Sequence, residues 1–109
     1  MVKQVKSVKG KLSGEQPDIS WLYYPGGEIL PVQPGPKSVT IIELTSVNPW
    51  RMVLDYYRKL LSGQGWELFE DHIFDDRGTV SFRHSSQGMV TVLAAQDADA
   101  THIRIYTKK

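Results

Sequence analysis

Residues 48–66 decide the fold of this chain, and they read Asn48-Pro49-Trp50-Arg51-Met52-Val53-Leu54-Asp55-Tyr56-Tyr57-Arg58-Lys59-Leu60-Leu61-Ser62-Gly63-Gln64-Gly65-Trp66. Apolar side chains recur at the spacing of one helical face, at Trp50, Val53, Tyr57, Leu60 and Leu61. Asn48 suits the N-cap and Pro49 the first helical position, where a missing N–H costs nothing. Gly63 suits a left-handed cap, and Gly65 completes the stop. The pattern predicts one long amphipathic helix over residues 49–63.

The sequence on both sides of this helix predicts strands. The β-branched run at residues 37–46 indicates one strand before it, and shorter extended pieces are expected near 19–24 and 28–32, separated by a Pro-Gly turn at 25–27. Four extended runs follow, at residues 66–74, 79–84, 89–95 and 101–107. Short connections favour an antiparallel meander. We therefore expect an α+β fold, with a mostly antiparallel sheet of about five strands and the helix across one face.

Alternation along the last strands separates two faces of that sheet. The apolar face comprises Val80, Phe82, Val90, Val92, Ala94, Ile103 and Ile105. The opposite face comprises Thr79, Ser81, Arg83, Thr91 and Arg104. This assignment comes from hairpin loops that end in left-handed Gly78 and Gly88, with Ser85 facing Met89.

Strand 66–74 is ambiguous, because neither of its faces is wholly apolar. A bulge near its middle would bring Leu68 and Ile73 to the same side. Its register stays open, with Glu70 opposite either Arg83 or His84.

Composition limits the classes of function. The 109 residues contain no cysteine, which excludes disulfides and thiolate chemistry, and the formal net charge is +1. No run approaches the roughly 18 apolar residues of a membrane span. Residues 1–17 carry Lys3, Lys6, Lys9 and Lys11 with valines at a spacing of three, which suits neither helix nor strand. We expect a flexible basic arm there and a single α+β domain over residues 18–109.

No motif predicts catalysis or metal binding. His72, His84 and His102 fall on three different predicted strands, and no helical pair of metal-ligand spacing exists. Asp97 and Asp99 lie in a predicted turn that lacks the glycine and glutamate of a calcium loop. The sequence therefore favours a protein without a catalytic residue, metal or cofactor.

Aromatic and basic side chains provide the candidate binding residues. Trp21, Tyr23 and Tyr24 cluster before the Pro-Gly turn, where they either pack beside the sheet or form a recognition patch. The open sheet face is expected to present a second set, Arg83, Arg104 and Tyr106 together with Thr91. An exposed strand edge could also pair with another chain, giving a homodimer or a complex with a protein partner.

These features favour a non-catalytic binding or protein-interaction domain. One alternative is a small ligand carrier or enzyme, with a pocket between the helix and a curved sheet lined by Glu70, His72 or His84. Another is contact of the lysine arm with nucleic acid or anionic lipid, although no aromatic residue interleaves the lysines for base stacking.

One further pattern links Tyr24-Pro25-Gly26, a strand ending near Thr45, the pair Tyr56-Tyr57, and Gly65-Trp66. Over residues 22–107 the chain resembles a set of small, uncharacterised bacterial α+β domains that share this order of motifs. Members are often envelope proteins or lipoproteins, and no activity accompanies the pattern. The resemblance implies the same fold. It also implies a bacterial envelope location if a leader has been removed, and a cytoplasmic one otherwise.

Overall fold

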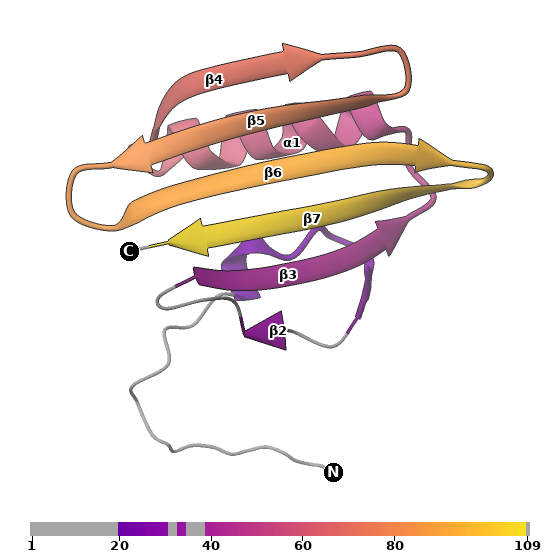
Figure 1. Cartoon of the computed structure of the whole chain (residues 1–109), viewed down its shortest axis with the longest axis horizontal. Helices are drawn as coiled ribbons and strands as arrows, with labels where there is room; N and C mark the ends of the chain where they lie inside the picture. Colours follow the sequence, from indigo (N-terminus) through magenta and orange to yellow (C-terminus); the bar gives the residue numbers. More distant parts are fainter. Residues whose placement is uncertain (1–19, 31–32, 35–38, 109) are drawn as a thin grey trace, which may run out of the picture.

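The protein is a two-layer α+β structure in which one helix covers one face of an antiparallel sheet (Figure 1). The structure, a computed structural model, describes residues 20–30, 33–34 and 39–108, and the predicted arm at 1–17 lies outside them. In chain order the elements are η2 (Ser20–Leu22), β1 (Glu28–Ile29), β2 (Gln33–Pro34), β3 (Val39–Ser46), α1 (Trp50–Gly63), β4 (Glu67–Ile73), β5 (Arg77–His84), β6 (Gly88–Asp97) and β7 (Ala100–Lys108).

The sheet has the strand order β1-β3-β7-β6-β5-β4, and every strand pair is antiparallel. The predicted meander is confirmed, since β4 to β7 lie side by side in sequence order. The expected number of about five strands is too low, because the described residues form seven strands of one sheet. The short strands β1 and β2 both pair with the same edge of β3, one near each end of it. Because β7 pairs with β3, the strands β7, β6 and β5 separate β3 from β4, the two strands that α1 connects.

The segment predicted as a strand near 19–24 is instead a 3-10 turn followed by a β-turn. The Tyr23 N–H donates to the Ser20 carbonyl at 3.0 Å, and the Gly27 N–H donates to the Tyr24 carbonyl at 3.0 Å. Leu22 and Tyr24 are buried, so the segment turns its side chains into the core. The Tyr57 hydroxyl holds it there by donating to the Leu22 carbonyl at 2.7 Å. Consecutive apolar residues without alternation suit this turn better than a strand.

The predicted helix is confirmed, but both of its ends differ in detail. Trp50 is the first helical residue, and Asn48 makes no capping bond; its side-chain amide donates to the Tyr24 hydroxyl at 2.7 Å. The left-handed residue is Gly65, at φ +89°, rather than Gly63. The Trp66 N–H donates to the Leu61 carbonyl and the Gly65 N–H to the Ser62 carbonyl, the two bonds of a Schellman motif.

The core lies between α1 and the apolar face of the sheet. One row of it crosses four strands, from Val80 through Val92 and Ile105 to Ile42, each without exposed surface. The helix contributes Val53, Leu54, Tyr57 and Leu61, which are equally buried. The two predicted faces of the sheet are therefore confirmed.

The predicted pairing registers need two corrections. Met89 faces Arg83 rather than Ser85, a shift of two residues that leaves every side chain on its predicted face. In β4 the register shifts between Leu68 and Glu70, which confirms the bulge and brings Leu68 and Ile73 to the helix side. Glu70 faces Ser81, and Glu67 faces Arg83, so neither register proposed for Glu70 holds. A bulge changes the count of residues along a strand, which alternation alone cannot locate.

Candidate interaction surface

The open face of the sheet carries two of the predicted binding residues side by side. Arg104 and Tyr106 of β7 form a polar group with Glu43 of β3. Arg104 donates to the Tyr106 hydroxyl at 3.3 Å and pairs with the Glu43 carboxylate at 3.5 Å. The hydrogen bond to Tyr106 and the charge of Glu43 raise the pKa of Arg104. This group is compact, and its cation is already partnered within the chain.

Arg83 is separated from that group and belongs with β4. It lies on β5, whereas Arg104 lies on β7 with β6 between them. The Arg83 guanidinium contacts Glu67 at 3.0 Å and lies over the Phe69 ring, with Cζ 5.6 Å from the ring centroid. The three open-face residues thus form two sites rather than one.

The aromatic side chains before the Pro-Gly turn pack against the core of the protein. The Tyr24 ring is buried, with its centroid 5.1 Å from that of Tyr56 in an edge-to-face contact. The half-buried Trp21 ring packs 6.3 Å from Trp66, and Tyr23 packs against the core. The structure accounts for these residues through folding, and their part in binding stays a prediction.

The three histidines do not converge. His72 is 3.7 Å from Glu70, and His102 is 3.2 Å from Asp97. His84 packs against Trp66 at 5.3 Å between ring centroids. Among the described residues, no three histidine, aspartate or glutamate side chains gather in a way that could hold a metal ion.

Two hollows formed by described residues lie outside the helix–sheet interface. One of about 530 Å³ lies on the outer flank of α1 and is lined by Tyr24, Met52, Asp55, Tyr56 and Lys59. Another of about 400 Å³ lies at the β4–β5 turn, along residues 74–77. Both are open to solvent, whereas the inner face of α1 packs directly on β5 and β6.

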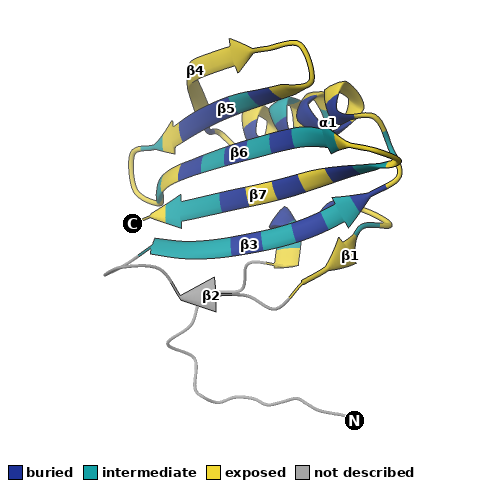
Figure 2. Ribbon diagram, turned by 45° about the vertical axis from the view of Figure 1, so that its right-hand side comes forward, coloured by how far each residue is buried: buried dark blue, intermediate teal, exposed yellow. Residues whose placement is uncertain are grey.

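Strand β4 differs from every other long strand because all seven of its residues are exposed (Figure 2). It ends the strand order, and no strand among the described residues pairs with its outer edge. Four large apolar side chains on or next to it are open to solvent: Leu68 at 42%, Phe69 at 38%, Ile73 at 44% and Phe74 at 59%. Apolar side chains beside unpaired backbone groups make β4 the candidate interaction surface.

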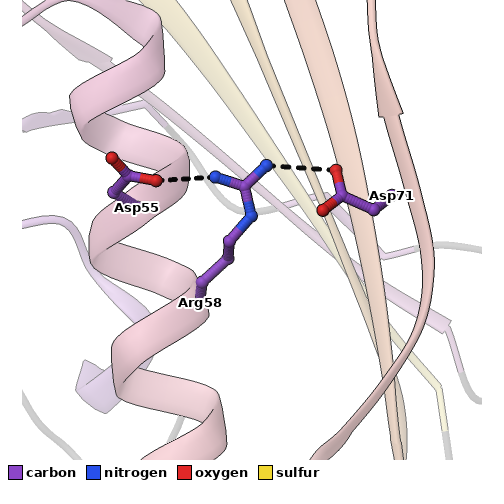
Figure 3. Close-up of polar contacts among 3 residues, drawn as sticks. All are labelled: Asp55, Arg58 and Asp71. Atoms are coloured by element: carbon purple, nitrogen blue, oxygen red, sulfur yellow. Dashed lines mark hydrogen bonds and ion pairs between the residues drawn. The ribbon is translucent and has the colours of Figure 1, made fainter.

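A guanidinium clamp fixes β4 against the helix (Figure 3). Arg58 of α1 donates to Asp55 at 2.6 Å and to Asp71 of β4 at 3.0 Å. Burial by itself lowers the pKa of Arg58, but the hydrogen bonds and charges of Asp71 and Asp55 outweigh it and raise that pKa. The Arg58–Asp71 contact links β4 to α1 in addition to the pairing of β4 with β5, and it leaves the outer edge of β4 open.

The sequence predicts an exposed strand edge but does not indicate which strand forms it. The available signal was the ambiguity of strand 66–74, which has acidic and apolar side chains on both faces. Charged residues on both faces are typical of an edge strand, since a central strand buries at least one face.

Comparisons with protein-family models, with curated proteins and with solved structures found no match. The resemblance to small bacterial envelope domains therefore stays a prediction. Within the described part of the chain, no helix has both the length and the apolar character needed to cross a membrane.

Proposed function

We propose that this protein is a non-catalytic protein-interaction domain that binds its partner by adding a strand to β4. The observation that carries the proposal is the combination at this edge of exposed backbone and exposed apolar side chains. Leu68, Phe69 and Ile73 are available as anchors for the side chains of an added strand.

Strand addition uses backbone groups that an edge already presents. In an antiparallel ladder, alternate residues direct their N–H and C=O groups away from the neighbouring strand. Those of β4 point away from β5 and can bond an extended partner, while side-chain contacts on the two faces give specificity. Pairing with β5 and the Arg58–Asp71 contact already hold β4 extended, which lowers the entropy cost of binding a partner strand.

The ligand-carrier and enzyme alternative has less support. It requires a cavity between helix and sheet, but Val53, Leu54 and Tyr57 fill that interface with no exposed surface. No histidine lines the hollow on the flank of α1 or the hollow at the β4–β5 turn. The nucleic-acid or lipid alternative depends on the lysine arm, which lies outside the described residues. An envelope location stays a prediction from the resemblance.

Selection of short extended peptides from a displayed library tests the proposal. We expect selected peptides to shift the backbone amide signals of β4 and to lose binding when Leu68 and Ile73 are both changed to Asn. Met52→Asn is the matched control, because Met52 is a similarly exposed apolar residue on the outer side of α1. Peptides that bind the β4 double variant unchanged, or that shift the amides around Arg104 instead, would refute the assignment of β4.

A further inference from the structure

The β4 edge is strongly acidic although the chain as a whole is not. Five of the twelve acidic side chains of the chain fall within residues 67–76, where there is no lysine or arginine. They are Glu67, Glu70, Asp71, Asp75 and Asp76. The formal net charge of the whole chain is +1.

Cations of the chain balance part of this charge. Arg83 pairs with Glu67, Arg58 with Asp71, and Arg77 with Asp76 at 3.3 Å. Among the described residues, neither Glu70 nor Asp75 pairs with a lysine or arginine; Glu70 lies 3.7 Å from the His72 imidazole. The edge therefore keeps an excess of negative charge next to its exposed apolar groups.

This charge disfavours a second copy as the partner at β4. An antiparallel pair of β4 strands related by a twofold axis brings the middle of each strand against the middle of the other. The middle residues are Glu70 and Asp71, so every register near the centre places carboxylates opposite or diagonal to carboxylates. Like charges in cross-strand positions are destabilising, and acidic residues on an edge are a recognised barrier to self-pairing.

The two faces of β4 favour different side chains in an added strand. On the helix side lie Leu68, Ile73 and the already paired Asp71, opposite Phe82, Gly78 and Val80. On the open side lie Glu67 and Glu70, opposite Arg83 and Ser81. An extended segment with apolar residues at alternate positions would contact Leu68 and Ile73, and lysine or arginine between them would face Glu70.

Resting on the proposed function, we infer that the partner segment at β4 is basic: an extended stretch in which lysine or arginine alternates with β-branched apolar residues. The apolar residues pack on the helix side of the edge, and the basic ones pair with the open-side carboxylates. The charge that keeps two copies apart thereby selects the partner and speeds its approach.

Three labelled peptides as long as β4 test this with the full chain. The first is Lys-Val-Lys-Val-Lys-Val-Lys, the second replaces each lysine by glutamate, and the third replaces each valine by glycine. Binding is followed by fluorescence anisotropy, and the site by backbone amide shifts. We expect that only the first peptide binds and shifts the amide signals of β4. Its affinity should fall as the ionic strength rises.

A charge reversal and its matched control locate the effect. Glu70→Lys is expected to lower the affinity for the Lys-Val peptide about tenfold or more. Glu28→Lys makes the same change on β1, at the opposite edge of the sheet, and is expected to leave the affinity unchanged. Both residues are exposed, so neither change disturbs the core.

The outcomes separate this inference from the proposed function. If the Glu-Val peptide binds β4 as tightly, strand addition stands and the basic partner is wrong. If the Lys-Gly peptide binds equally, attraction is electrostatic alone and the alternating segment is wrong. If β4 amides shift with protein concentration in the absence of peptide, the partner is a second copy and the inference is overturned. If no valine peptide reaches β4, the proposed function fails as well.

Discussion

At the scale of single residues, Gly78 shows how packing uses a position that the sequence marks as a turn. Gly78 lies within β5 and not at a left-handed loop position, since the glycines with positive φ are Gly26, Gly65 and Gly88 among the described residues. A Cβ atom at Gly78 would lie 2.6 Å from Leu54 Cδ1 and 2.9 Å from Ile73 Cδ1. The helix can approach the sheet here because this side chain is absent.

We expect Gly78→Ala to lower the free energy of unfolding by about 1–3 kcal/mol, the usual cost of overpacking. Urea denaturation measures it. Gly63→Ala is the control, because nothing lies within 4 Å of a Cβ atom at that helical position. The control should stabilise the protein by up to about 1 kcal/mol. Equal effects of the two substitutions would contradict the close approach at Gly78.

Tyr57 couples the stability of the fold to alkaline pH. Burial, with the neighbouring Tyr56 and Tyr24, raises the pKa of Tyr57. At a pH below the ordinary tyrosine pKa of about 10, the phenol is protonated in both the folded and the unfolded chain, and the contribution of Tyr57 to stability is fully present. As the pH rises above that value, the unfolded chain releases the phenol proton while the folded chain keeps it. The free energy of unfolding therefore falls by up to about 1.4 kcal/mol per pH unit from this group.

The difference between the wild-type protein and Tyr57→Phe isolates this effect. Denaturation from about pH 9 to about pH 11 should show a steeper loss of stability in the wild-type protein than in the variant. The variant itself loses about 1 kcal/mol at neutral pH, because the buried Leu22 carbonyl loses its donor. Parallel pH profiles would mean that Tyr57 ionises as readily in the folded protein as in the unfolded one.

At the scale of elements, the helix stop determines where β4 begins. Gly65 at φ +89° reverses the chain, and the N–H of the buried Trp66 then donates to the Leu61 carbonyl at 3.0 Å. A Cβ atom at Gly65 would lie 3.8 Å from the His84 ring, an ordinary contact distance. Glycine is therefore needed here for its left-handed backbone conformation and not to avoid a steric clash.

We expect Gly65→Ala to cost about 1–2 kcal/mol, the penalty of a left-handed residue with a side chain. Gly65→Asn should cost clearly less, since asparagine adopts that conformation more readily. Thermal denaturation of both variants measures the order. An asparagine variant that is no more stable than the alanine variant would point to packing against His84 instead.

At the scale of the whole molecule, the sheet has two unlike edges. One is formed by β1 and β2, which are two residues long, and the other by the seven-residue β4. The longer edge carries both the exposed apolar side chains and the excess of carboxylates. Repulsion between these carboxylates should keep the protein monomeric.

Removing this repulsion should allow self-association. We expect Glu70→Gln combined with Asp75→Asn to form dimers or larger species in sedimentation velocity, under conditions where the wild-type protein is a monomer. Glu28→Gln combined with Asp99→Asn removes the same charge away from β4 and should stay monomeric. Raising the ionic strength should shift the wild-type protein toward the same species. A wild-type dimer at low ionic strength would contradict this account of the edge.

The sequence by itself determined the features that depend on local periodicity. The spacing of Trp50, Val53 and Tyr57 located the helix and its buried face, because the period of 3.6 residues belongs to the helix alone. Alternation along β5, β6 and β7 separated core from open face, and a register error of two residues could not change it. The ambiguity of β4 even indicated its bulge.

The tertiary structure decided what depends on long-range packing. It made β4 the free edge, separated Arg83 from Arg104, turned Trp21 and Tyr24 inward, and placed Gly78 under the helix. Strand order and close approach arise from contacts between segments far apart in the chain, and no local period encodes them. The surface proposed for function lies among these features, because an edge exists only once the other strands have paired.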